Sequence, residues 1–153
     1  AEAARLLSDD SPVEIIEADS DAHIIRKHDS DIVCGAIFNP GKTFSGTPVV
    51  RTNIPLAYIF ENPDSIQDTA ARLTVCEPDM RRPYKAHMGL LTDEDVIAEE
   101  KPHLTTVVLD GHYTLNDGPE DAVLSYDEDS GTTSISFTTI RGNNYSFKIT
   151  GQK

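Results

Sequence analysis

The sequence predicts an all-β protein, an antiparallel β-sandwich of about ten short strands. Short runs with alternating or continuous apolar residues follow one another along most of the chain. Clusters of Gly, Asn, Asp and Pro, which favour turns, separate these runs. A length of 153 residues fits one domain with a substantial core. Together these observations favour two packed antiparallel sheets.

The expected strands, in chain order, span residues 13–17, 22–27, 32–38, 47–52, 54–60, 72–76, 104–115, 122–126, 132–139 and 145–149. The run 54–60 is apolar on both faces, the pattern of a strand covered on both sides. The alternation at 72–76 ends abruptly at Glu77-Pro78-Asp79. The strand phase places six residues in the core, namely Leu73, Val75, Ile135, Phe137, Phe147 and Ile149. Short helical segments are expected only at 2–7 and 92–100.

Three turns shape the expected topology. Residues 141–144 (Arg-Gly-Asn-Asn) tolerate positive φ, so the strands 132–139 and 145–149 should form a hairpin. Asp110-Gly111 offers two interpretations: a tight turn that splits 104–115 into two strands, or a bulge within one long strand. Residues 127–131 (Asp-Glu-Asp-Ser-Gly) lack the ligand pattern of a calcium-binding EF-hand loop and are predicted to be a hairpin turn.

The charge balance excludes several classes of partner. With 26 acidic residues against 13 Lys and Arg, the formal net charge is −13. This charge opposes binding to nucleic acid, to anionic membranes and directly to a sulfated glycan. No apolar run approaches the ~20 residues of a membrane span, and the first residues are too charged for a signal peptide. The chain lacks a starting methionine, so we expect a mature protein or a piece of a longer one.

Cysteines, histidines and tyrosines give weak functional signals. Cys34 and Cys76 lie inside expected strands and are predicted to be buried free thiols rather than a disulfide. The histidines that flank expected strands (His23, His28, His103 and His112) are predicted to be strand-edge or surface residues. A carbohydrate platform needs flat aromatic surface, and the chain has no Trp. Tyr58, Tyr126 and Tyr145 are expected in the core, which leaves Tyr84 and Tyr113 as candidate exposed rings.

The order of four segments, 21–28, 34–40, 54–60 and 72–83, resembles the C-terminal β-sandwich of the polysaccharide lyase family eight enzymes. These are the chondroitin and hyaluronan lyases, and the resemblance leans toward the chondroitinase ABC branch. It implies a tail of a preceding element at 1–10 and one sandwich domain at 11–153. A glycine recurs inside the corresponding family strand, which favours the bulge at Gly111.

The resemblance also implies a function. The family cleaves uronic-acid glycosaminoglycans by β-elimination, with a base and an acid held in a helical toroid and a central β-sandwich. We therefore expect an accessory domain with no catalytic, cofactor-binding or metal-binding residue of its own. Its partners would be the catalytic and central domains of the same polypeptide. The parent would bind an anionic polysaccharide as substrate, in the periplasm or outside the cell.

One segment reverses the sign of the local charge. Arg81, Arg82 and Lys85 fall beside Tyr84 within a long break between expected strands. Breaks of this length inside compact domains are usually functional or disordered. We expect these four residues to contact a partner domain, in preference to ion pairs on a solvated loop or direct contact with substrate. The alternative function is a free-standing carbohydrate-binding or adhesion module, because sandwiches serve both purposes.

Overall fold

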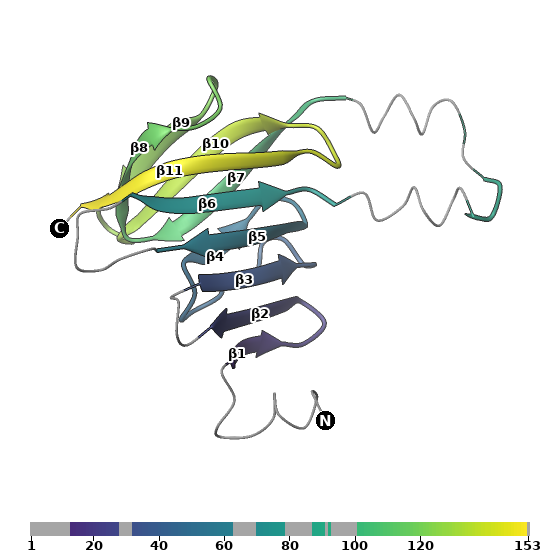
Figure 1. The fold of residues 1–153 in the computed structure, drawn as a ribbon, viewed down its shortest axis with the longest axis horizontal. Coiled ribbons are helices and arrows are strands. Elements are labelled where there is room, and N and C mark those ends of the chain that lie inside the picture. The colour runs from purple at the N-terminus through teal and green to yellow at the C-terminus, as the bar shows by residue number, and fades with distance from the viewer. Residues whose placement is uncertain are drawn as a thin grey trace.

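The computed structural model describes residues 13–27, 32–62, 70–78, 87–90, 92 and 101–152. Over these residues the chain forms eleven strands in two antiparallel sheets, as Figure 1 shows. The all-β antiparallel sandwich that the sequence predicts is therefore confirmed. The expected helix at 2–7 and the tail at 1–10 lie outside the described residues, as does all of the expected helix at 92–100 except Thr92.

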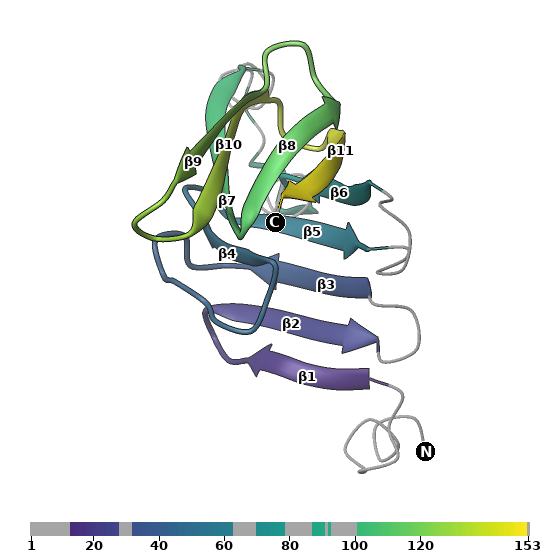
Figure 2. The ribbon, with the colours of Figure 1, turned by 90° about the vertical axis from the view of Figure 1, so that its left-hand side faces the viewer.

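The described strands divide into a large sheet of seven and a small sheet of four. In spatial order the large sheet contains β1 (Val13–Ala18), β2 (Ala22–Lys27), β3 (Ile32–Ile37), β5 (Leu56–Glu61), β6 (Ala71–Cys76), β11 (Asn144–Gln152) and β8 (His112–Asp117). The small sheet contains β4 (Val49–Thr52), β7 (His103–Asp110), β10 (Thr132–Thr139) and β9 (Val123–Asp127). Figure 2 shows that the small sheet covers one part of the large sheet, while β1 and β2 extend beyond it.

The core lies between the two layers, where the apolar phases of facing strands meet. All six residues that the strand phase places in the core are at most 2% exposed. The rings of Phe137 on β10 and Phe147 on β11 pack edge-on, with centroids 4.8 Å apart. The connection between β3 and β4 adds Phe44, which is 3% exposed and belongs to the same cluster as Ile24 and Ile37.

The predicted hairpin between the last two strands does not form. β10 pairs with β7 and β9 in the small sheet, whereas β11 pairs with β6 and β8 in the large one. The turn with Gly142 at φ 82° therefore carries the chain from one sheet to the other. Both strands alternate cleanly, so their apolar faces pack against each other across the core instead of lying side by side.

The run 104–115 is split into two strands, as one of the two interpretations predicts, but these strands do not pair with each other. It divides at Gly111 into β7 of the small sheet and β8 of the large sheet. Gly111 has φ 106°, a backbone conformation that residues with a Cβ rarely adopt. Thr133 fixes this corner, because its hydroxyl donates to the Gly111 carbonyl at 2.7 Å and accepts from the Tyr113 N–H at 3.0 Å. The favoured bulge was wrong because the chain changes sheets there.

Three aromatic or apolar positions also differ from the strand-phase predictions. Tyr126 is 38% exposed and stacks on His112, so it is not a core residue. Tyr113, expected to be exposed, packs against the core edge and is half-buried. Ile59 is 44% exposed, so β5 is covered on one face only. Among the described residues, no helix has the length and hydropathy to cross a membrane.

Candidate functional site

The four residues that the sequence singles out, Arg81, Arg82, Tyr84 and Lys85, lie outside the described residues. Their contact with a partner domain stays a prediction. The structure does describe the two ends of the segment that contains them. One end is Glu77-Pro78, directly after β6, and the other is residues 101–103, where β7 begins.

A buried carboxylate joins these two ends. Glu77 continues the inward phase of Leu73 and Val75, and its side chain is 8% exposed. Its Oε2 lies 2.6 Å from Nε2 of His103, and its Oε1 accepts a hydrogen bond from Nε of Arg141 at 3.1 Å. The hydroxyl of Thr139 donates to Oε2 at 3.2 Å. A carboxylate in this position is tolerated because it is paired and hydrogen-bonded.

The Glu77 cluster (Glu77, His103, Thr139 and Arg141) ties together elements of both sheets. Its members come from the end of β6, the start of β7, the end of β10 and the turn after it. The backbone reinforces it, since the Gly142 N–H donates to the Glu77 carbonyl at 2.8 Å. His103 is the first residue of β7, as the strand-edge prediction expects, and it also pairs with Glu77. The overlooked signal was an acidic residue on the buried phase of a strand.

Several other described histidines and tyrosines make separate structural contacts. His112 stacks on Tyr126 at 3.9 Å between centroids, and His23 packs edge-on against Phe38 at 5.2 Å. The Tyr58 hydroxyl lies 2.6 Å from the Thr47 hydroxyl, and burial raises the pKa of Tyr58 to about 12. The part of the chain that the structure describes holds no group of three or more His, Cys, Asp or Glu placed to bind a metal ion.

The acidic turn at 127–131 is a hairpin turn, as the sequence predicts. It joins β9 and β10, which pair with each other. The Asp127 carboxylate accepts hydrogen bonds from the Ser130 hydroxyl at 2.7 Å and the Asp129 N–H at 3.1 Å. These bonds lower the pKa of Asp127. The carboxylate is therefore engaged in closing the turn.

The outward face of the large sheet carries two ordered rows of side chains. Strand register places Glu61, Arg72, Lys148 and Asp117 side by side across β5, β6, β11 and β8. A second row, one step along the strands, consists of Ile15, Ile25, Cys34, Ile59, Thr74 and Ser146. We call the four apolar members of this second row, from Ile15 to Ile59, the outer strip.

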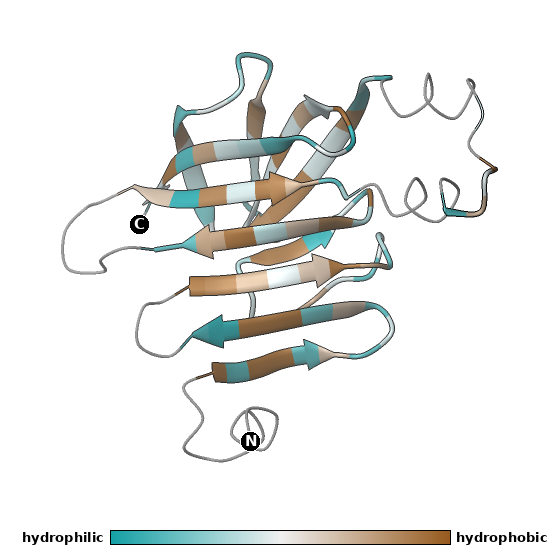
Figure 3. Ribbon diagram, turned by 45° about the vertical axis from the view of Figure 1, so that its right-hand side comes forward, coloured by the Kyte–Doolittle hydropathy of each residue, from teal (hydrophilic) through white to brown (hydrophobic). Residues whose placement is uncertain are grey.

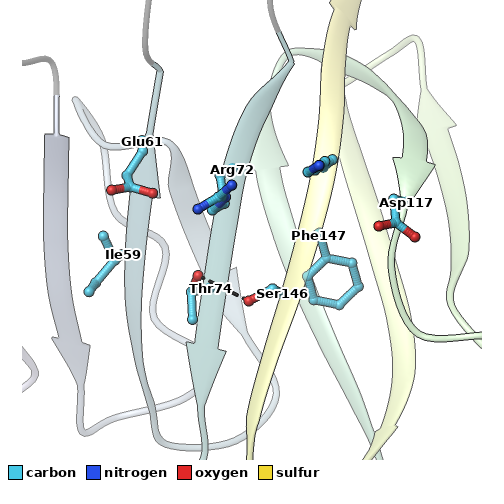
Figure 4. Close-up of a pocket in the computed structure, with 8 residues that line it drawn as sticks. Ile59, Glu61, Arg72, Thr74, Asp117, Ser146 and Phe147 are labelled. Carbon is cyan, nitrogen blue, oxygen red and sulfur yellow. Dashed lines mark hydrogen bonds between the residues drawn. The ribbon is translucent and has the colours of Figure 1, made fainter.

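Where the two rows meet, the sheet has a shallow hollow of about 250 Å³. Figure 4 shows Arg72 between Glu61 and Asp117, with Thr74 and Ser146 beneath it. The hydroxyls of Thr74 and Ser146 lie 3.4 Å apart. Neither Arg72 nor Lys148 forms an ion pair with any residue that the structure describes. Sequence reasoning missed this site because residues 72 and 148 meet only through strand pairing.

A second hollow, of about 350 Å³, lies on the inner side of the large sheet, lined among others by Arg26, Asp110 and Tyr113. Its aromatic surface is limited, because the half-buried Tyr113 ring packs edge-on against Phe60 at 6.2 Å. The ring therefore does not offer the open flat face on which a sugar stacks. The hollow adds no support to the carbohydrate-binding alternative.

Comparison with known proteins relates this chain to others through its fold. No known protein family and no curated protein sequence matches it. The solved Streptomyces coelicolor A3 chondroitin AC lyase, in complex with chondroitin sulphate, resembles it with a TM-score of 0.65 at 12% identity, covering 97% of this chain and 16% of the lyase. A Paenibacillus xanthan lyase resembles it with a TM-score of 0.62 at 10% identity, covering 99% and 12%.

These likenesses establish the fold. The sandwich described above is that of a domain found in polysaccharide lyases, and the chain spans less than a fifth of either lyase. The sequence resemblance and the structural one thus agree on a β-sandwich fold that occurs in polysaccharide lyases.

Proposed function

We propose that this chain is the accessory C-terminal β-sandwich domain of a polysaccharide lyase of family eight. The parent enzyme degrades uronic-acid glycosaminoglycans, chondroitin sulfate or hyaluronan, by β-elimination, in the periplasm or outside the cell. One observation carries the proposal. Nearly the whole chain matches a fold that makes up only 12–16% of two polysaccharide lyases.

The domain contributes no catalytic group in this proposal. β-Elimination needs a base beside the uronic carboxylate and an acid that protonates the leaving oxygen. Two described side chains of types that suit these roles already serve the fold, since His103 pairs with Glu77 and Tyr58 is buried against Thr47. This supports the expectation that the chemistry belongs to other domains of the parent.

The direct test compares this chain with the complete polypeptide on chondroitin sulfate and hyaluronan. Cleavage creates an unsaturated uronate, which is followed by its ultraviolet absorbance. We expect product from the complete polypeptide and none from the 153-residue chain. Product from the chain alone would contradict the accessory role, and a complete polypeptide that is inactive on both polymers would contradict the parent's assignment.

In the complete enzyme, Arg81, Arg82, Tyr84 and Lys85 contact a neighbouring domain. Arg and Tyr are favoured as interface anchors, and these cations locally reverse the sign of a chain whose net charge is −13. We predict that Arg81→Glu/Arg82→Glu in the complete polypeptide lowers both the melting temperature and turnover without changing a catalytic group.

The matched control for that variant is Arg51→Glu/Lys101→Glu, which makes the same change of charge at two exposed positions. The control should retain the stability and turnover of the wild type. Unchanged melting and turnover in the Arg81/Arg82 variant would place these residues on a solvated loop.

A further inference from the structure

We infer that the outward face of the large sheet docks against a neighbouring domain of the same polypeptide, through the outer strip and the adjacent cation pair Arg72–Lys148. The inference rests on the proposed function, because it takes the partner to be another domain of the parent enzyme. It adds which surface docks and what the partner must present there, namely apolar side chains and at least one acidic group.

The outer strip is apolar where a solvated sheet face is usually polar. Ile15, Ile25 and Ile59 are 45%, 42% and 44% exposed, and Cys34 lies between the last two in the register. Antiparallel sheets with one face in water normally alternate apolar and polar residues. In Figure 3 β2 and β5 each carry a brown, hydrophobic band within the strand, whereas β3 is brown at its ends and paler in its middle. A continuous exposed patch of this kind marks an interaction surface.

The cation pair Arg72–Lys148 requires the partner to present a negative charge. Lys148 and Arg72 are direct partners across the β11–β6 pair. Like charges directly opposite each other destabilise a sheet. No described acid forms an ion pair with either cation, although Glu61 and Asp117 are their register neighbours. An acidic side chain from a partner, placed in the hollow beside the Thr74 and Ser146 hydroxyls, would relieve this repulsion.

Two other occupants fit the surface less well. A polysaccharide would need flat aromatic rings, and the outer strip contains only Ile and Cys. A second copy of the chain would bring its own net charge of −13 against an equal charge, so the two would repel. A protein domain with apolar and acidic groups satisfies both the outer strip and the cation pair.

The test measures thiol alkylation in the complete polypeptide, with each cysteine identified by peptide mass. One variant carries Ile25→Cys in the outer strip, and the other carries Val123→Cys on the small sheet. The replaced side chains are 42% and 63% exposed, so exposure alone accounts for less than a twofold difference in rate. We expect the Ile25→Cys thiol to react about tenfold or more slowly, which corresponds to about 1.4 kcal/mol of docking free energy.

Charge reversal supplies the second arm of this experiment. Adding Arg72→Glu/Lys148→Glu should restore fast alkylation of Ile25→Cys, whereas Arg51→Glu/Lys101→Glu should leave it slow. Equal rates for the two engineered thiols would overturn the inference. Protection that depends on protein concentration would indicate a second copy, and protection that appears only with added chondroitin sulfate would indicate a glycan. Either result would also overturn it.

The inference and the proposed function fail separately. A complete polypeptide with lyase activity but an unprotected Ile25→Cys thiol would retain the function and lose the docking surface. A protected thiol in a polypeptide without activity on uronic-acid polymers would retain the docking surface and lose the function.

Discussion

Gly35 and Tyr58 form a close cross-strand pair that fixes the inner face of the large sheet. They are register partners on β3 and β5. A Cβ added at Gly35 would lie 2.3 Å from Cε1 of Tyr58, so the tyrosine ring lies over the glycine. The ring's hydroxyl thereby reaches Thr47, in the connection that covers this part of the core.

Because no Cβ fits there, Gly35→Ala should destabilise the fold by about 1–3 kcal/mol, the usual cost of overpacking a core. The measurement is the free energy of unfolding in urea. In a Tyr58→Leu background the ring is gone, and the same substitution should cost much less, as a double-mutant cycle would reveal. An equal cost in both backgrounds would show that the ring is not the obstacle.

The β1–β2 turn contains two acidic residues, Asp19 and Asp21, whose contribution to the stability of the fold depends on pH. Lys42 Nζ lies 2.8 Å from Asp21 and 3.2 Å from Asp19. The pKa of Asp19 is lowered from 3.8 to about 2, first by the Asp21 N–H and then by the Ala22 N–H. The pKa of Asp21 is also lowered, chiefly by its hydrogen bond from Lys42.

A carboxylate with a lowered folded pKa stabilises the fold above its unfolded pKa, and this contribution is lost as pH falls toward the folded value. We therefore predict that Asp19→Asn is less stable than the wild type at pH 7, and that the difference disappears as pH falls from 3.8 to about 2. Urea midpoints across that range measure it. Glu128→Gln, an exposed change in another turn, is the control. A difference independent of pH would exclude the charge as its cause.

At the scale of single elements, the strand phases position the core. Phe147 is fully buried on β11 and packs against Phe137 of the opposite sheet. Truncation of such a residue leaves a cavity that its neighbours fill only in part. Phe147→Ala should therefore cost about 3–5 kcal/mol, enough to unfold a domain of ordinary stability.

The control for this change is Ser146→Ala, which alters the exposed face of the same strand and should change stability by less than about 0.5 kcal/mol. Thermal melting compares the two variants. A melting temperature for Phe147→Ala within a degree or two of the wild type would mean that the strand phase is wrong.

Strand positions and most inward faces followed from the alternation of single segments, with exceptions such as Tyr126, but the assignment of strands to sheets did not. Alternation indicates which side of a strand is buried, but it does not indicate which other strand pairs with it. The two strands around Gly142 therefore suggested a hairpin, although they belong to different sheets. The Glu77 cluster and the Arg72–Lys148 pair escaped notice for the same reason, because they join residues distant in sequence.

For the molecule as a whole, the net charge and the exposed side chains favour contact with another domain over direct contact with a glycan. A net charge of −13 repels an anionic glycan at long range, and the exposed aromatic rings among the described residues, Phe38 and Tyr126, each pack against a histidine. The outer strip and the Arg72–Lys148 pair, which face outward from the large sheet, are instead apolar and cationic. These features are the ones on which the proposed docking surface rests.

Whether the domain itself binds glycan is measured most directly by titrating the 153-residue chain with chondroitin sulfate and hyaluronan oligosaccharides at low and moderate salt. Salt at 0.1 M screens charges beyond about 10 Å, so it would uncover any specific site that repulsion hides. We predict no saturable binding at either salt concentration, while the complete polypeptide binds the same oligosaccharides. Saturable binding to the chain that persists or strengthens at moderate salt would contradict the account.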